Sequence, residues 1–276
     1  MKKSIVWLAS YPKSGNTWTR IFLANYFANE INPLPINDAD RFGTTDAQMQ
    51  LYRRAAGGPF DPNDKRLLPV LRGRFLSGIA SNGADFNFIK THNVNGAAYG
   101  AELIPPQVTR AAVYLVRNPL DVALSFARHF GCTADDAVGR MARGDYVIKR
   151  TEQLMTQYLG SWSDHVASWT KPAPFPVIAM RYEDMLHKPK ETFSTMLTAL
   201  GLPLDEGRLD KAVRFSSFDE LSRQERETGF KETSPHSESF FTKGQSGQWE
   251  NDLAPELADR IRKDHKKMMK KFNYFR

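Results

Sequence analysis

The 276-residue sequence has one cysteine, Cys132, and this scarcity excludes two kinds of site. A single thiol cannot form an intramolecular disulfide, and it cannot supply the thiolate cluster of a structural zinc centre. Long hydrophobic runs are missing too, because the longest apolar stretches, 5–9 and 111–116, are far shorter than the roughly 20 residues that span a bilayer. Lys2 and Lys3 are typical of the start of a signal peptide, but polar residues interrupt the apolar core that should follow. We therefore expect a cytoplasmic protein without a membrane span.

Excess charge is confined to the C-terminus. The net charge is +7, and residues 260–276 hold eight of the 38 lysines and arginines and one of the 31 acids, so the other 259 residues carry 30 of each. A body without net charge argues against nucleic-acid binding, which needs a basic face. We interpret 255–272 as a basic helix with solvated lysines, since its apolar residues recur at helical spacing. Attraction of this helix to a polyanion or an acidic membrane is the alternative.

No internal repeat, low-complexity tract or Gly/Ser linker divides the chain, so 1–276 is predicted to form a single domain. Short apolar runs predict strands, most of them without the alternation of a half-exposed sheet, at 4–9, 86–89, 112–116 and 177–180. Helical periodicity predicts helices over 17–29, 64–79, 118–130, 133–142, 151–169, 183–200, 205–214, 217–227 and 255–271. This alternation indicates an α/β fold with a central, mostly parallel sheet flanked by helices. The stretch 30–61 has weak periodicity and is predicted to be a long loop, such as a binding lid.

A polar cluster follows each predicted strand, at 10–17, 90–92, 117–119 and 181–184. Ligands of open α/β sheets bind at the carboxyl ends of the strands, so these clusters predict one site. The first cluster reads Tyr-Pro-Lys-Ser-Gly-Asn-Thr-Trp over 11–18 and places a glycine turn between a strand and a helix, as a phosphate-binding loop does. It is not the standard P-loop motif, because Asn16 stands in place of the lysine and Lys13 lies three residues earlier.

These clusters, and two segments further along, resemble the cytosolic-type sulfotransferases that use 3′-phosphoadenosine 5′-phosphosulfate (PAPS). The segment 11–18 resembles the family's 5′-phosphosulfate loop, 117–125 its 3′-phosphate motif, and 182–190 the segment near the adenine. The short run 216–218 matches an adenine-side segment, and 243–251 resembles the late loop that closes on the 3′-phosphate. The resemblance implies that the cofactor is bound by Lys13, Ser14, Gly15, Asn16, Thr17, Trp18, Arg117, Ser125, Tyr182, Ser216, Phe218, Thr242, Lys243 and Gly244.

The same resemblance implies a catalytic set of His92, Lys13 and Lys90. Sulfuryl transfer builds charge on a leaving oxygen, which a nearby lysine such as Lys13 would stabilise, and it removes a proton from the acceptor hydroxyl. A histidine with a reference pKa near 6.5 is suited to take that proton. Lys90, two residues before His92 on an extended segment, can point the same way and assist the sulfuryl group. The histidines have no metal-ligand spacing, so no metal is expected to be required.

Some features depart from the family pattern or leave alternatives open. Thr242 stands where many relatives carry arginine, so one guanidinium contact to the 3′-phosphate is missing or comes from elsewhere. The dimer-contact pattern of the animal enzymes is absent, which leaves a homodimer open. The acceptor is expected to be a small molecule with a hydroxyl or, less favoured, an amine. An apolar acceptor pocket, or simply the core, would account for the aromatic residues Phe42, Tyr52, Phe60, Phe75, Phe130, Tyr146, Phe230, Phe240 and Phe241.

Two other functions compete with the sulfotransferase interpretation. A P-loop kinase or NTPase would have the same fold, but this chain lacks the Gly-Lys-[Ser/Thr] triplet that holds the phosphates and Mg²⁺. A non-catalytic module that binds anions or RNA through the basic helix is the second rival, and the absence of net charge on the body argues against it.

Overall fold

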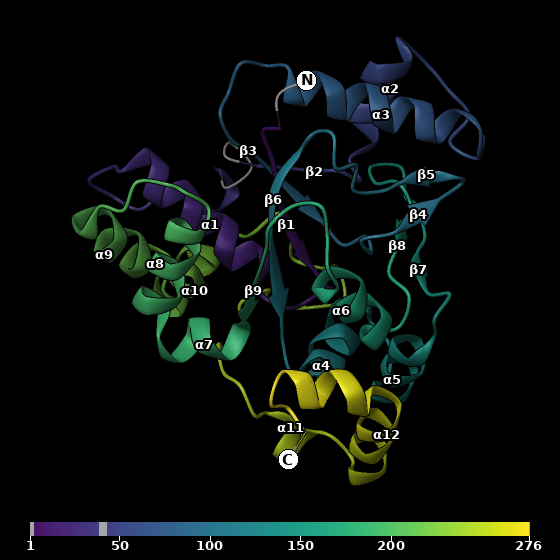
Figure 1. Cartoon of the computed structure of the whole chain (residues 1–276). Helices are drawn as coiled ribbons and strands as arrows, with labels where there is room; N and C mark the ends of the chain where they lie inside the picture. The colour runs from purple at the N-terminus through teal and green to yellow at the C-terminus, as the bar shows by residue number, and fades with distance from the viewer. Residues whose placement is uncertain (1–2, 39–42, 276) are drawn as a thin grey trace.

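The computed structural model describes residues 3–38 and 43–275 and has a five-stranded parallel sheet at its centre (Figure 1). The strands are hydrogen-bonded in the order β2-β3-β1-β6-β9. Their bounds are Ile5–Ser10 for β1, Thr44–Thr45 for β2, Asn87–Thr91 for β3, Thr109–Val116 for β6 and Val177–Arg181 for β9. Every residue of β1 is buried, as expected for the middle strand of a sheet covered on both faces. The predicted fold class is confirmed.

Helices cover both faces of the sheet because side chains alternate along its strands. Ile5, Trp7 and Ala9 of β1 pack with residues of α2 to α6 and α12, whereas Val6 and Leu8 pack with residues of α1 and α7 to α9. Figure 1 shows these two groups on opposite sides of the strands. The helices are α1 (Asn16–Ala28), α2 (Met49–Ala56), α3 (Leu67–Ala80), α4 (Pro119–Phe130), α5 (Ala134–Ala142), α6 (Trp162–Thr170), α7 (Tyr182–His187), α8 (Pro189–Ala199), α9 (Glu206–Phe215), α10 (Phe218–Thr228), α11 (Trp249–Asp252) and α12 (Pro255–Lys271).

The predicted long loop over 30–61 is wrong in part, because it contains the edge strand β2 and the helix α2. The two residues of β2 pair with Ile89 and Lys90 of β3, and a strand this short leaves no periodic pattern in the sequence. Two further short antiparallel pairs escaped prediction for the same reason: β4 (Ala97–Ala98) with β5 (Ala101–Glu102), and β7 (Val147–Ile148) with β8 (Gln157–Tyr158).

Two predicted helices have different bounds in the structure. The segment predicted as helical from 151 becomes helical only at Trp162, where Ser161 and Asp164 form a reciprocal capping box. Gly160, with a φ of 65°, turns the chain just before this cap and prevents an earlier start. The predicted helix 183–200 is divided into α7 and α8 at Lys188, because Pro189 can begin a helix but cannot continue one.

The basic C-terminal segment forms the amphipathic helix α12. Its buried residues, among them Ile261, His265 and Met269, face helices α4, α5 and α6. Its lysines alternate with these residues in the sequence and lie on the opposite face of the helix. Among the described residues, no helix has both the length and the apolar character needed to cross a membrane.

Candidate active site

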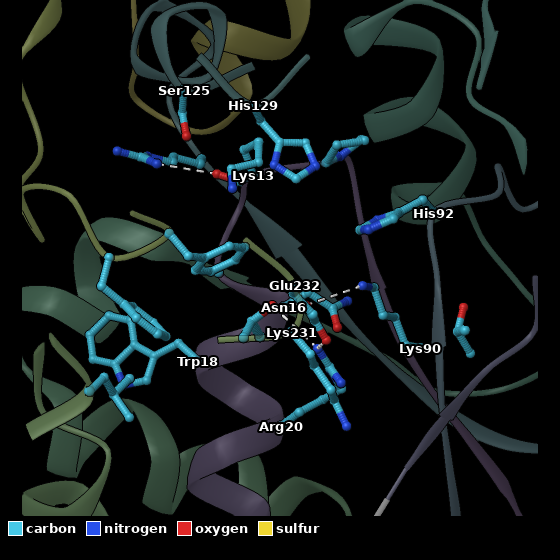
Figure 2. Close-up of a pocket in the computed structure, with 18 of the residues that line it drawn as sticks. Lys13, Asn16, Trp18, Arg20, Lys90, His92, Ser125, His129, Lys231 and Glu232 are labelled. Atoms are coloured by element: carbon cyan, nitrogen blue, oxygen red, sulfur yellow. Dashed lines mark hydrogen bonds and ion pairs between the residues drawn. The ribbon is translucent and has the colours of Figure 1, made fainter. Parts of the chain in front are cut away.

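A cavity of about 1030 Å³ opens at the carboxyl ends of β1, β3 and β6. The residues predicted from the four strand-end clusters meet here, as the close-up in Figure 2 shows for Lys13, Lys90, His92 and Ser125. Of all the predicted site residues, only Ser14 and Lys243 are absent from the cavity wall. The tertiary structure therefore brings together segments from position 12 to position 248 of the chain.

The loop between β1 and α1 is held in an unusual backbone conformation. Lys13 and Gly15 have φ angles of 68° and 99°, and a Cβ on Gly15 would lie 3.0 Å from a ring carbon of Tyr182. Asn16 Nδ2 donates to the carbonyl oxygen of Leu8 at 2.7 Å and to Ser10 Oγ at 3.2 Å. Asn16 thus ties the loop to its strand, and Lys13, three residues before the position of the standard P-loop lysine, lines the cavity.

One polar atom of this loop is buried without a partner. Ser14 is 1% exposed, and its hydroxyl makes no hydrogen bond within residues 3–38 and 43–275. An unpaired buried hydroxyl is costly unless a ligand satisfies it. A loop that combines this donor with the N-terminus of α1 is suited to hold an anion.

A second corner of the cavity, lined by Arg117, Ser125 and Arg128, is suited to an anion. Arg117 donates from Nη1 to the carbonyl oxygen of Lys13 and from Nη2 to that of Gln245, each at 3.2 Å, while its buried Nε has no partner among the described residues. Ser125 and Arg128 line the cavity from α4. Burial, followed by the positive charge of Arg117, lowers the pKa of Arg128. An anion placed at this corner would relieve their repulsion.

Aromatic side chains form a slot beside the first loop. The rings of Trp18 and Tyr182 meet edge to face with centres 5.8 Å apart, and the Arg117 guanidinium carbon lies 4.2 Å from the Tyr182 ring centre. Phe218 lies against Gly244, where an added Cβ would come within 2.3 Å of the ring. Ser216 lines this end of the cavity too, and its hydroxyl donates to a carbonyl of α9. The slot is suited to a flat ring system.

His92, the predicted base, is held in one tautomer. Its Nδ1 lies 2.7 Å from the carbonyl oxygen of Ser10, and since a carbonyl only accepts, Nδ1 carries the proton and Nε2 is left as the acceptor. Burial, followed by the charge of Lys90, lowers the pKa of His92 well below 6.5. Behind it, His165 Nε2 donates to the His92 carbonyl at 3.1 Å and the Tyr114 hydroxyl donates to His165 Nδ1 at 3.0 Å. His92 is therefore a neutral, well-positioned proton acceptor.

Lys13 has a lowered pKa. Its Nζ lies 3.9 Å from the centre of the Phe240 ring. Burial comes first among the causes, and the positive charges of Lys90 and Arg117 add to it, so that the pKa of Lys13 falls to about 7. At neutral pH the amine is therefore about half protonated, and a further negative charge beside it would favour the protonated form.

Glu232 brings a carboxylate into the same cavity. It forms an ion pair with Arg20, accepts a hydrogen bond from Thr17 Oγ1 at 2.9 Å, and lies 3.7 Å from Lys90 Nζ. Burial alone would raise the pKa of this carboxyl, but the positive charges of Lys90 and Arg20 outweigh burial and hold the pKa well below its usual range. Glu232 is charged at neutral pH.

A family model described as "Sulfotransferase domain" matches residues 3–273. The chain belongs to the sulfotransferase family. Among curated relatives, "Sulfotransferase 1 family member D1" from Mus musculus is 25% identical over 276 residues, which cover 95% of this chain and 82% of the relative. "Cytosolic sulfotransferase 13" from Arabidopsis thaliana is 26% identical over 290 residues, covering 97% and 78%. The family predicted from the five motifs is confirmed, and the kinase and RNA-binding alternatives are not favoured.

A solved sulfotransferase structure has the same fold. The crystal structure of a mouse sulfotransferase complexed with PAP superimposes on this chain with a TM-score of 0.64 at 20% sequence identity, and the match covers 98% of this chain and 86% of the other. At this identity the likeness establishes the fold alone.

One predicted site residue of this sulfotransferase, Lys243, points away from the cavity. Lys243 Nζ forms an ion pair with Asp252 at 2.7 Å and is absent from the cavity wall, whereas its neighbours Thr242 and Gly244 line the wall. The chain turns at Gly244, which has a φ of 58°, so consecutive side chains face different ways. In this arrangement the cavity receives the Thr242 hydroxyl and the Gly244 backbone rather than the ammonium group.

Sequence reasoning missed Arg20, Arg128 and Glu232 as parts of the sulfotransferase cavity. Arg20 and Arg128 carried a signal, because each lies three residues beyond a predicted site residue, Thr17 or Ser125, on the same helix and therefore on the same face. No sequence pattern pointed to Glu232, since it belongs to an irregular segment and meets α1 only in the folded chain. Within the described residues, no group of three or more His, Cys, Asp or Glu side chains could hold a metal ion.

Proposed function

We propose that this sulfotransferase transfers the sulfuryl group of PAPS to a hydroxyl, or less favourably to an amine, of a small acceptor, with His92 as the general base. The observation that carries the proposal is the 2.7 Å contact between His92 Nδ1 and the Ser10 carbonyl. This bond leaves Nε2 as the acceptor on the wall of the cavity that the phosphate-loop residue Lys13 also lines. A neutral imidazole and a lysine in one cavity provide the two functions that sulfuryl transfer needs.

The residues of the cavity fit the charged groups of PAPS. The unpartnered Ser14 hydroxyl and the N-terminus of α1 would hold the 5′-phosphosulfate, together with Lys13, Gly15, Asn16 and Thr17. Asn16 would act through the loop conformation that its side chain maintains.

The 3′-phosphate fits the corner formed by Arg117, Ser125 and Arg128, where Arg117 Nε has no partner within the described part of the chain and both arginines line the cavity. Arg128 would supply the guanidinium that the family pattern places at position 242. Thr242 and Gly244 would close the corner, and we expect Lys243 to reach it only if the ion pair with Asp252 opens.

The aromatic slot of Trp18, Tyr182 and Phe218 would take the adenine, with Ser216 beside it. When bound, PAPS supplies an activated sulfuryl group. Lys13 and Lys90 bring positive charge to the place where negative charge develops, and His92 Nε2 receives the proton of the acceptor hydroxyl. The burial that lowers the pKa of His92 keeps its imidazole neutral, so that Nε2 can accept a proton.

Several further properties belong to this proposal. We expect catalysis without a metal, because Lys13 and Lys90 stand where a kinase would place Mg²⁺. The Arabidopsis relative is named as a cytosolic sulfotransferase, which supports a cytoplasmic location for this protein. The proposal is compatible with a homodimer. The body of the chain, residues 1–259, has no net charge, which supports a small-molecule acceptor rather than a nucleic acid.

The test measures turnover of PAPS with a panel of phenols, alcohols, saccharides and amines. The release of 3′,5′-ADP is the readout. We expect turnover with at least one hydroxyl acceptor, undiminished by EDTA, and thermal stabilisation by 3′,5′-ADP but not by ATP with Mg²⁺. The proposal fails if 3′,5′-ADP does not bind, or if activity appears only with ATP and is lost with EDTA.

A further inference from the structure

The cavity has a second half that the PAPS-binding residues do not occupy. It lies beyond β3, on the side where β2 joins the sheet, because Thr45 pairs with Lys90 and Asp46 N donates to the Lys90 carbonyl at 3.1 Å. The helix α2 and the segment around β7 and β8 complete this half. It adjoins Lys90 and His92, and we call it the acceptor half.

The wall of the acceptor half is rich in amides and hydroxyls. Two threonines and four glutamines line it: Thr44, Thr45, Gln48, Gln50, Gln153 and Gln157. Three of the glutamines, Gln48, Gln50 and Gln153, are exposed to solvent. The apolar residues Met49, Ile148 and Leu154 lie among them. Arg53 and Glu152 add one charge of each sign, so the wall has no net charge. A glutamine amide both donates and accepts, and a threonine hydroxyl does the same.

Most of the aromatic residues considered for an apolar acceptor pocket lie elsewhere. Tyr52 and Phe75 are buried in the core with ring centres 5.0 Å apart, and Phe60 stacks on Tyr52. Phe42 is outside the described residues. Only Phe130, Phe240 and Phe241 line the cavity, and Phe240 covers Lys13 rather than the acceptor half.

We propose that the acceptor is an uncharged polyhydroxylated molecule, a saccharide or a molecule with a sugar-like run of hydroxyls, rather than a phenol or a sterol. This inference rests on the proposed function. Neighbouring hydroxyls pair with side chains that both donate and accept, and an apolar ring pressed against the same amides would leave them unpaired, which is costly. The neutral balance of Arg53 and Glu152 argues against a strongly charged acceptor.

The transfer is balanced by groups already named. One acceptor hydroxyl oxygen forms the new bond to sulfur as the bond from sulfur to the bridging phosphate oxygen of PAPS breaks. The hydroxyl proton goes to His92 Nε2, and the bond's electron pair leaves with 3′,5′-ADP.

The experiment compares two panels on the full-length protein. Maltose, lactose and methyl glucoside represent the proposed class, and para-nitrophenol, naphthol and a hydroxysteroid represent the apolar class. Calorimetry measures binding of each compound to the complex with 3′,5′-ADP, and turnover with PAPS gives kcat/KM. We expect saccharides to bind the complex and to be turned over at least ten-fold more efficiently than the apolar panel.

Variants Gln50→Leu and Gln153→Leu test the wall itself. Each should lower kcat/KM for the preferred saccharide by about ten-fold, mainly through KM, while the affinity for 3′,5′-ADP stays unchanged, since Gln50 and Gln153 are exposed side chains whose amides would pair with the acceptor alone. Gln107→Leu, an exposed glutamine outside the cavity, is the matched control and should change neither quantity.

The outcomes separate the two proposals. Preference for the apolar panel, or unchanged saccharide kinetics in both leucine variants, overturns the acceptor assignment and leaves the sulfotransferase function intact. Binding of 3′,5′-ADP without binding or turnover of any saccharide also overturns it. Failure of the wild-type protein to bind 3′,5′-ADP overturns the proposed function instead.

Discussion

The Lys90 Nζ lies 3.7 Å from a carboxylate oxygen of Glu232, and the other partners of that carboxylate are Arg20 and Thr17. Lys90 and Thr17 are the residues proposed to meet the phosphosulfate. A bound anion must therefore share them with a negative charge that the protein itself supplies. In the ligand-free protein, Glu232 compensates the cations that would otherwise repel one another inside a largely buried cavity.

Replacing Glu232 with Gln should strengthen the binding of 3′,5′-ADP, by about three- to ten-fold, because a repelling charge leaves the cavity while the shape is kept. The same change should lower thermal stability, since the largely buried ion pair between Arg20 and Glu232 is lost. Calorimetry and a melting curve measure the two effects. Weaker binding of 3′,5′-ADP to Glu232→Gln would contradict this role for the carboxylate.

Binding of 3′,5′-ADP should be coupled to the uptake of a proton by Lys13. The pKa of Lys13 is about 7 in the ligand-free protein, and an anion beside it raises that pKa. At about pH 8 the free amine is therefore mostly neutral and the bound one protonated, so binding takes up close to one proton. Calorimetry in buffers of different ionisation enthalpy measures this uptake. Lys13→Met should abolish it, and a binding enthalpy that is independent of the buffer in the wild type would refute the assignment.

His92 should make turnover insensitive to pH through the neutral range. Its pKa is lowered well below 6.5, first by burial and then by Lys90, so the neutral form that accepts a proton prevails until the solution is clearly acidic. We expect kcat/KM, which reports the free enzyme, to fall only below that lowered pKa. A fall in kcat/KM centred near 6.5 would mean that His92 titrates as an ordinary exposed histidine.

Substitution of His92 by Gln or Ala should cost roughly 10²-fold or more in kcat, the usual contribution of a positioned base, with near-normal affinity for 3′,5′-ADP. His187→Gln, an exposed histidine outside the cavity, is the control and should keep full activity. If His92→Gln retains more than about a tenth of the wild-type kcat on an aliphatic alcohol, His92 is structural.

Arg128 should contribute to binding only when the ligand has a 3′-phosphate. Arg128→Gln is expected to weaken 3′,5′-ADP by about ten-fold and to leave 5′-AMP unchanged, because a charge-assisted hydrogen bond to phosphate is lost. Adding Thr242→Arg to that variant should recover much of the affinity. Arg54→Gln, on an exposed arginine away from the cavity, controls for net charge. An equal loss for both nucleotides would place Arg128 outside the 3′-phosphate corner.

Local spacing in the sequence was enough to predict which polar residues after the strands would line one cavity. Lys13 and Asn16 lie within one turn between a buried strand and a helix, and Lys90 and His92 lie two residues apart at the end of another strand. Strand order in a parallel sheet brings such ends to one edge, so residue type and position along the chain predict the meeting place. The short, uninterrupted apolar runs of β1 and β6 likewise predicted strands buried on both faces.

Tertiary packing decided the rest, because it depends on contacts between segments that no local pattern links. Glu232 meets Thr17 only after an irregular segment folds back over α1, and β2 exists only because β3 offers it an edge. The sequence left the direction of the His92 pKa open, since nearby lysines lower it and a bound anion raises it. In the ligand-free protein, the depth of burial determines that direction, because desolvation disfavours the charged imidazole and only the folded chain removes the water.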